Sequence, residues 1–212
     1  TNIKDSSILV ISSAIKSNNV EIREAKIKNL PIYKRGDMLA HITSLKKNIV
    51  VSGSHGKTTT TSLIASIFAN AKLDPTIING GVINSLENSA KLGKSEWSIL
   101  ESDESDGSFV KVPSTYAVVT NIDREHMDYY KSLDNLKKHF IKFMLKVPSF
   151  GKTFICIDDK NNRDICKTSK IKNILTYGFH KNSNFKIKKF SFFKNKSFFD
   201  IEMNLPNKKK TL

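Results

Sequence analysis

A short glycine-rich segment between two apolar stretches is the feature that most constrains this chain. Residues 48–51, Asn-Ile-Val-Val, form an apolar β-branched run of the kind found in buried parallel strands. Gly-Ser-His-Gly-Lys-Thr-Thr follows at positions 53–59. Apolar residues then recur at helical spacing between Leu63 and Phe68, which predicts a helix over residues 57–71. A strand, a glycine-rich loop and a helix in this order predict an α/β fold.

The loop has the composition of a phosphate-binding loop. Its glycines let backbone N–H groups converge into an anion nest, and the helix N-terminus adds its positive dipole end. Lys57 is expected to reach the terminal phosphates, and the Thr58 hydroxyl to ligate Mg²⁺. Val51 stands where the usual pattern has an additional glycine, so the loop is shorter than usual. The predicted ATP-binding residues are Gly53, Ser54, His55, Gly56, Lys57, Thr58 and Thr59.

Two further polar segments directly follow apolar runs. Residues 98–100 lead into Glu-Ser-Asp-Glu-Ser-Asp at 101–106, and residues 117–119 lead into a segment that contains Asn121 and His126. Ligands of parallel sheets bind beyond the carboxyl ends of the strands. Carboxylates at that edge would face the phosphate loop and hold Mg²⁺. His126 is a candidate metal or phosphate contact.

The remaining pattern predicts a parallel sheet with helices on both faces. Further strands are expected at residues 97–101, 116–122, 153–157 and 174–177. Residues 185–190 and 197–203, separated by a polar turn, predict an antiparallel pair at the sheet edge or on a small separate sheet. At the other end, residues 8–11 and 30–33 predict two short extended pieces and residues 37–45 a brief helix. These elements are too few to bury a hydrophobic core by themselves. They are typical of the last part of a larger domain.

Composition narrows the class of protein. The net charge of +15 comes mostly from lysines spread along the chain, and no recognised nucleic-acid-binding motif accompanies them. The charge therefore favours anionic small molecules over nucleic acid. The sequence contains no run of eighteen apolar residues, so it does not predict a membrane span. Two cysteines, Cys156 and Cys166, without metal-ligand spacing and without an apolar signal segment, favour a reducing cytoplasm.

Together, residues 53–60, 101–106 and 120–128 resemble the Mur ligase family of peptidoglycan synthesis. The resemblance covers roughly residues 5–206. It implies that residues 1–46 are the last part of a UDP-binding Rossmann-like domain and residues 47–212 the central ATP-binding domain. It further implies that the family's C-terminal ligase domain is absent from this chain.

The resemblance also implies roles for particular residues. ATP would phosphorylate the muramate carboxylate to an acyl phosphate, and an amino group would then displace phosphate. Lys57 would stabilise the β- and γ-phosphates, while Thr58, Glu101 and His126 would hold Mg²⁺. Glu104 is the alternative to Glu101. Lys57, Glu101 and His126 are therefore the expected catalytic residues. The expected substrate contacts are Ser12 and Ser13 for the UDP part and Asn121 for the muramate side.

The implied substrates are UDP-N-acetylmuramate and L-alanine. Two alternatives stay open from the sequence: a recycling ligase that joins a tripeptide to the same sugar nucleotide, and a non-catalytic nucleotide-binding fragment. Because the C-terminal ligase domain is expected to be absent, these 212 residues alone are predicted to be inactive.

Overall fold

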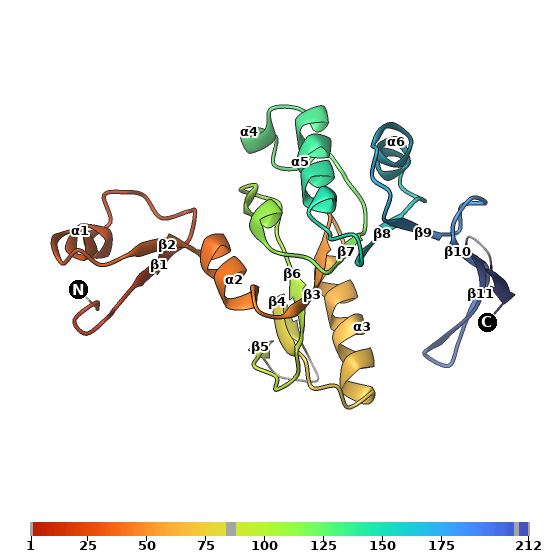
Figure 1. Cartoon of the computed structure of the whole chain (residues 1–212), viewed down its shortest axis with the longest axis horizontal. Helices are drawn as coiled ribbons and strands as arrows, with labels where there is room; N and C mark the ends of the chain where they lie inside the picture. Colours follow the sequence, from red (N-terminus) through yellow and green to blue (C-terminus); the bar gives the residue numbers. More distant parts are fainter. Residues whose placement is uncertain (1, 84–87, 206–207, 212) are drawn as a thin grey trace.

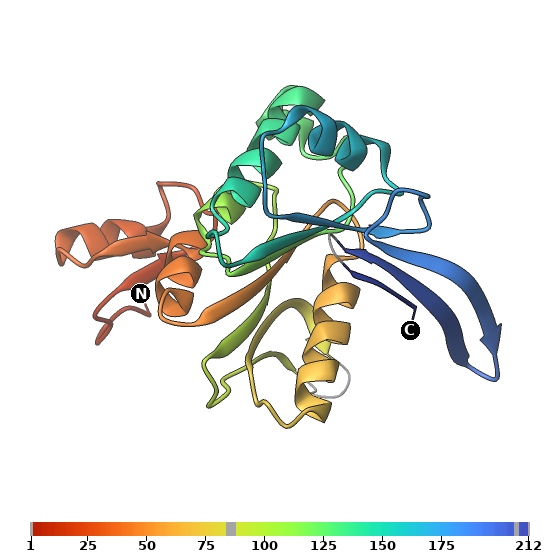
Figure 2. The same cartoon turned by 45° about the vertical axis from the view of Figure 1, so that its right-hand side comes forward.

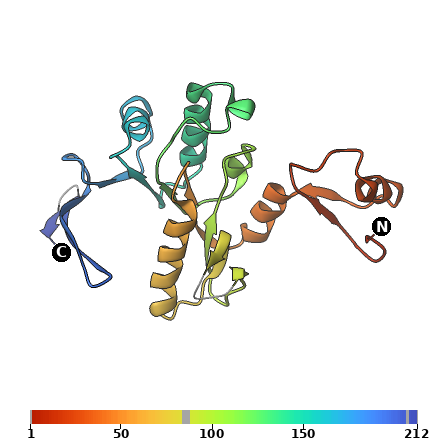
Figure 3. The ribbon, with the colours of Figure 1, turned by 180° about the vertical axis from the view of Figure 1, so that it is seen from behind.

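The computed structural model describes residues 2–83, 88–205 and 208–211. Near the N-terminus, β1 (Leu9–Ile11) and β2 (Ile32–Lys34) form a two-stranded parallel sheet, with α1 (Val20–Ile27) between them along the chain. Figures 1 and 3 show this small unit at one end of the molecule, joined to the main body through α2 (Arg35–Thr43). β1 and β2 agree with the two short extended pieces expected at residues 8–11 and 30–33, and α2 agrees with the brief helix expected at residues 37–45. Their origin in a UDP-binding domain stays a prediction.

A ten-stranded sheet forms the main body, in the order β12-β11-β10-β9-β8-β7-β3-β6-β4-β5. Every neighbouring pair from β10 to β4 is parallel, whereas β5, β11 and β12 pair antiparallel at the two edges. The strands are β3 (Lys47–Ser52), β4 (Thr76–Ile83), β5 (Asn88–Lys91), β6 (Trp97–Glu101), β7 (Tyr116–Val119), β8 (Lys152–Cys156), β9 (Ile174–Gly178), β10 (Phe185–Phe193), β11 (Lys196–Leu205) and β12 (Lys208–Thr211).

Helices lie on both faces of this sheet, as the sequence predicts. Figure 2 shows α3 on one side and α5 and α6 on the other. Successive strand residues point to opposite faces, so Val50 joins the core under α5 and α6, while Ile49 and Val51 join the core under α3. The helices are α3 (Lys57–Asn70), the 3-10 turn η1 (Ser108–Lys111), α4 (Met127–Tyr130), α5 (Leu133–Leu145) and α6 (Lys160–Thr168). Among the described residues, no helix has the length and apolar character to cross a membrane.

The antiparallel pair near the C-terminus belongs to the main sheet. β10 pairs parallel with β9 through Phe185 and Tyr177, which decides between the edge and the separate sheet that the sequence left open. Lys194 and Asn195 form the expected turn between β10 and β11, and both have positive φ, 47° and 59°. The sequence pattern did not predict β4, β5 or β12. The residues of β5 are all exposed and polar or small, so this strand has no apolar alternation to reveal it.

One predicted strand is shorter than expected. β7 ends at Val119, three residues before the expected end at Ile122. The Thr120 N–H still donates to the Ser52 carbonyl (3.1 Å), but the chain then turns toward the phosphate loop. Polar contacts of residues 120 and 121 with that loop replace further strand pairing, as described below.

A buried asparagine joins α2 to the sheet. Asn48 is 1% exposed, and its Nδ2 donates to the carbonyls of Thr43 (2.9 Å) and Pro113 (2.8 Å). The Ser98 hydroxyl donates to Asn48 Oδ1. Since a buried amide is costly unless its hydrogen bonds are made, these contacts fix the end of α2, the start of β3 and the approach to β7 relative to one another.

The core under α5 makes a direct prediction about stability. Phe140 is fully buried on α5 and its ring lies 5.0 Å from that of Phe109, whereas Leu145 on the same helix is 60% exposed. Phe140→Ala should lower the free energy of unfolding by about 3–5 kcal/mol because it leaves a cavity. Leu145→Ala should change it by less than about 0.5 kcal/mol. Urea unfolding followed by circular dichroism measures both, and equal losses would contradict the assigned core.

Candidate functional site

The phosphate loop connects β3 to α3 and owes its shape to two glycines. Gly53 has φ +139° and Gly56, directly before α3, has φ +77°. Residues that carry a Cβ rarely adopt these values. A Cβ on Gly53 would also lie 2.1 Å from Thr120 Oγ1. Gly56 has no atom within 4 Å of such a Cβ. Gly53 is therefore required by close packing as well as by backbone conformation.

The segment after β7 holds the loop from one side. Asn121 Oδ1 accepts a hydrogen bond from the His55 N–H (2.8 Å), and Asn121 Nδ2 donates to the His55 carbonyl (3.0 Å). Thr120 Oγ1 donates to the same carbonyl (2.7 Å). The Ser54 N–H donates to the Asn121 carbonyl (2.9 Å). The loop conformation thus depends on residues that lie more than sixty positions later in the chain.

The His55 side chain points toward acidic residues of that segment. Its Nε2 lies 3.3 Å from Asp123 Oδ2 and its Nδ1 lies 3.7 Å from Glu125 Oε1. The Arg124 backbone N–H and the His55 ring lower the pKa of Asp123. The Asp123 and His55 side chains are both exposed, so these contacts position the His55 ring without contributing much stability.

Lys57 lies at the centre of the loop, where it is paired with a buried carboxylate. Its Nζ donates to the carbonyls of Gly53 (2.6 Å) and Ser54 (3.1 Å) and forms an ion pair with Glu104 (3.0 Å). The Glu104 side chain is 0% exposed. Burial raises the pKa of Glu104, and the charge and hydrogen bond of Lys57 oppose that rise.

Glu101 contacts the neighbouring loop residue. Glu101 Oε2 accepts from the Thr58 hydroxyl (2.8 Å) and from the Gly80 N–H (2.8 Å). A Cβ on Gly80 would lie 2.8 Å from Glu101 Oε1, so a side chain there would displace this carboxylate from its present position. The sequence patterns described above did not indicate a role for Gly80. The Gly80-Gly81 doublet after the apolar residues Ile77 and Ile78 was a signal that could have identified it.

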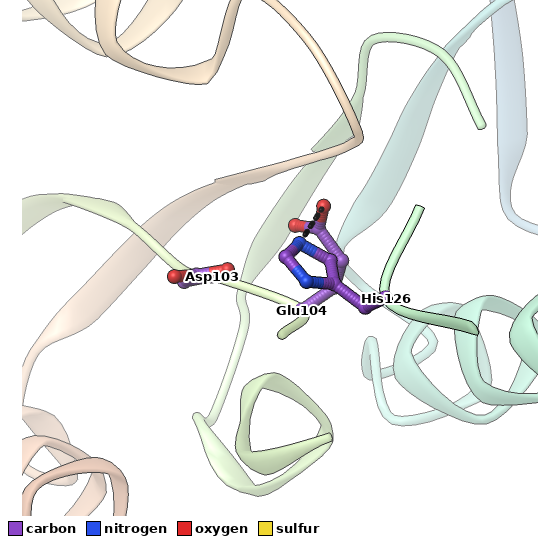
Figure 4. Close-up of side chains that lie close together, drawn as sticks. All are labelled: Asp103, Glu104 and His126. Atoms are coloured by element: carbon purple, nitrogen blue, oxygen red, sulfur yellow. Dashed lines mark ion pairs between the residues drawn. The ribbon is translucent and has the colours of Figure 1, made fainter. Parts of the chain in front are cut away.

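His126 groups with a different pair of carboxylates. One ligand atom each from Asp103, Glu104 and His126 lies within 4.8 Å of the others (Figure 4). His126 Nε2 lies 3.7 Å from Glu104 Oε1. The Tyr130 hydroxyl donates to the Glu104 backbone carbonyl and so holds the segment that contains Asp103 and Glu104 in place. Two carboxylates and an imidazole are a donor set that divalent cations accept, so Asp103, Glu104 and His126 fit a Mg²⁺ ion, as do Thr58 and Glu101.

A cavity of about 420 Å³ extends from Thr58 and Glu101 to the N-terminal unit. Ser13 and Arg35 line it on that side. Burial alone would raise the pKa of Asp106. Hydrogen bonds from Ser108 and Ser13 and the charge of Arg35 outweigh that effect, so the pKa of Asp106 is lowered overall. Of the two predicted serines, Ser13 lines this cavity. The Ser12 hydroxyl instead accepts from the Ala14 N–H (3.3 Å).

The fold and the loop define an α/β domain with a glycine-rich loop of the phosphate-binding type between a parallel strand and a helix. Residues 51–210 match the Mur ligase middle domain, and the chain belongs to the Mur ligase family.

The curated relatives include two named UDP-N-acetylmuramate–L-alanine ligase. The protein from Pelagibacter ubique is 67% identical over 208 residues, 98% of this chain and 45% of its own length. The protein from Parvibaculum lavamentivorans is 47% identical over 177 residues, 84% of this chain and 36% of its own length. The chain therefore spans less than half the length of these relatives.

Two solved structures share the fold. UDP-N-acetylmuramate-alanine ligase from Thermotoga maritima superposes with a TM-score of 0.82 at 23% identity, over 100% of this chain and 47% of that one. A ligase from Neisseria that acts on UDP-N-acetylmuramate and L-alanyl-gamma-D-glutamyl-meso-diaminopimelate has a TM-score of 0.79 at 22% identity, over 93% of this chain and 65% of that one. At these identities the likeness concerns the fold alone.

The two loop glycines differ in a testable way. Gly53→Ala must relieve both a strained φ and the contact with Thr120, whereas Gly56→Ala meets only the backbone strain of about 1–2 kcal/mol. Gly53→Ala should therefore lower the free energy of unfolding by at least about 1 kcal/mol more than Gly56→Ala. Urea titration of both variants measures the difference, and equal stabilities would contradict the observed packing of Gly53.

Asn121 should control the order of the loop. Asn121→Ala removes two hydrogen bonds to His55, so amide hydrogen exchange of residues 53–59 should accelerate and ATP should bind roughly tenfold more weakly. Asn182→Ala, at an exposed turn, serves as the matched control and should change neither quantity. Unchanged exchange in Asn121→Ala would mean that the loop is held by its other contacts.

Proposed function

We propose that this chain is the ATP-binding part of a ligase that adds L-alanine to UDP-N-acetylmuramate. The proposal rests on one observation above others: Lys57, Thr58, Glu101, Glu104 and His126 converge beyond the carboxyl ends of β3, β6 and β7. The family membership and the names of the relatives support this activity rather than the tripeptide-recycling alternative, which rests on fold likeness alone. We propose a cytoplasmic location, because both substrates of such a reaction are polar metabolites.

In this proposal the loop binds ATP and Lys57 stabilises the β- and γ-phosphates. Its Nζ already lies between two loop carbonyls and the Glu104 carboxylate, so a phosphate oxygen would replace contacts that Lys57 makes with Gly53 and Ser54. Transfer to the muramate carboxylate forms an acyl phosphate, and the alanine amino group then displaces phosphate. Negative charge builds up on the phosphoryl group during transfer, so clustered cations lower the barrier.

Mg²⁺ would supply part of that positive charge and would orient the phosphates. Thr58 and Glu101 would hold one ion, since their oxygens are 2.8 Å apart and both face the loop. His126 would contribute to a second ion together with Asp103 and Glu104. A structure of the Thermotoga maritima MurF ligase, a protein of the same fold with a TM-score of 0.66, is described as a complex with ADP.

For the substrates, we propose that the UDP part approaches from the side of the N-terminal unit. Ser13 and Arg35 line the cavity that opens there from Thr58. Ser12 and Asn121 remain candidate substrate contacts. Both side-chain polar groups of Asn121 are engaged by the loop backbone, so a muramate contact would have to share them or replace them.

Lys57 tests the proposal, provided that its second role is controlled. Lys57→Ala alone leaves the buried Glu104 unpaired, a change that typically costs about 3–5 kcal/mol of stability. The informative comparison is Glu104→Gln against Lys57→Ala/Glu104→Gln. The first should retain ATP binding, and the second should lose it by at least a hundredfold, because of these two residues Lys57 is the one that we propose to contact the phosphates.

Calorimetric titration measures both variants, first with ATP and then with Mg-ATP. A folded double variant that binds ATP as tightly as Glu104→Gln would remove Lys57 from the phosphate site. Incubation of the native chain with Mg-ATP, UDP-N-acetylmuramate and labelled L-alanine tests the complete reaction. The expected result is ATP binding without product, because the chain spans less than half of its relatives.

A further inference from the structure

An asparagine in the first turn of α6 joins the ends of two neighbouring strands. Asn162 is 0% exposed, and its Nδ2 donates to the carbonyls of Thr120 (3.2 Å) and Cys156 (2.8 Å). Cys156 is the last residue of β8, and Thr120 directly follows β7. The two N–H groups of this amide therefore fix the carboxyl ends of β7 and β8 relative to each other.

The preceding asparagine reaches the same segment two residues further along. Asn161 Nδ2 donates to the carbonyl of Ile122 (2.7 Å), a residue that is 1% exposed. Thr120 and Ile122 are the neighbours of Asn121 along the chain. The Asn121 side chain in turn holds the backbone of His55 in the phosphate loop. The two asparagines of α6 thus hold the backbone on both sides of the residue that clamps the loop.

The first turn of α6 is itself well anchored, so it can support that segment. The Asp159 side chain caps the helix by accepting from the Asn162 N–H (2.7 Å). Arg163 Nη1 donates to the carbonyl of Ile157 (2.6 Å), directly after β8, and Ile165 lies in the core that α5 covers. Asparagine near a helix start is commonly a cap. Because Asp159 already has that role, both asparagine side chains are directed at the segment after β7 instead.

We propose that Asn161 and Asn162 are positioning residues of the phosphate loop. They set the position of residues 120–122, and that segment sets the conformation in which residues 53–56 receive nucleotide phosphates. The inference rests on the proposed binding of ATP at this loop, but the contacts that support it involve protein groups alone. Replacement of either asparagine should disturb the loop through Thr120 and Asn121.

The half-buried Asn161 offers the cleaner test, and Asn173 is its matched control. Asn173 is also half-buried, and its Nδ2 donates to one backbone carbonyl, that of Pro148 (3.1 Å), at the opposite end of the sheet. In the ligand-free chain, Asn161→Ala should accelerate amide hydrogen exchange of residues 53–59 roughly fivefold. Calorimetric titration should show ATP binding weakened about fivefold as well, an effect of the size of one hydrogen bond. Asn173→Ala should change neither quantity.

A double variant separates positioning from a general loss of stability. If Asn161 acts through the Asn121 clamp, adding Asn161→Ala to Asn121→Ala should weaken ATP binding by less than about twofold further, because the contact that it supports is already absent. Two independent defects would instead multiply, and the double variant would bind ATP about fivefold more weakly than Asn121→Ala.

The deeper contact has its own control. Asn48 is buried like Asn162 and also donates to two backbone carbonyls, at the opposite end of the sheet. Asn162→Ala and Asn48→Ala should both lose stability, but only Asn162→Ala should accelerate exchange of the loop.

Two results would overturn the proposal: unchanged loop exchange in folded Asn161→Ala, or multiplied effects in the double variant. A native chain that binds no ATP would overturn the proposed function instead. Loop exchange in the ligand-free variants would still decide whether the α6 asparagines position the loop.

Discussion

The central position of β3 is the constraint on which the rest of the site depends. β3 is hydrogen-bonded to β6 on one side and to β7 on the other, with Ile49 opposite both Ile99 and Tyr116. Because all three strands are parallel, the segments that follow them emerge at one edge of the sheet. The phosphate loop, the acidic segment and the segment containing His126 meet there for this reason. A shift of register by one residue would reverse the faces of Ile49 and Val50 and expose the core.

Within that edge, a buried carboxylate organises the charges. Glu104 loses its hydration on folding, and Lys57 is the cation that compensates for the loss. The same pair holds the lysine side chain beneath the loop before any phosphate is present. Preorganisation of this kind reduces the entropy that must be lost when a ligand binds. The loop backbone is fixed separately by Asn121 and Thr120, so the charge and the conformation of the site have different sources.

Much of this arrangement could be predicted from local patterns. The apolar run at residues 48–51, the glycine-rich loop and the helical spacing after it specified β3, the loop and α3, because each pattern reports on neighbours along the chain. The positions at which strands end were less predictable. The strand expected at residues 116–122 ends at Val119, because side-chain contacts of Thr120 and Asn121 with His55 end the pairing. β5 was not predicted at all, since it pairs through its backbone and buries none of its side chains.

The sequence alone predicted the class of chemistry, because Lys57 and Thr58 at the start of a helix, and carboxylates directly after an apolar strand, are local patterns that a parallel sheet brings to one edge. Only the tertiary structure decided the pairing of groups. It joined Lys57 to Glu104, Thr58 to Glu101 and His126 to the carboxylates of residues 103 and 104. It also turned the polar groups of Asn121 onto the loop backbone. These partners come from separate strands, so the distances between them depend on strand order and register, which no single stretch of the chain contains.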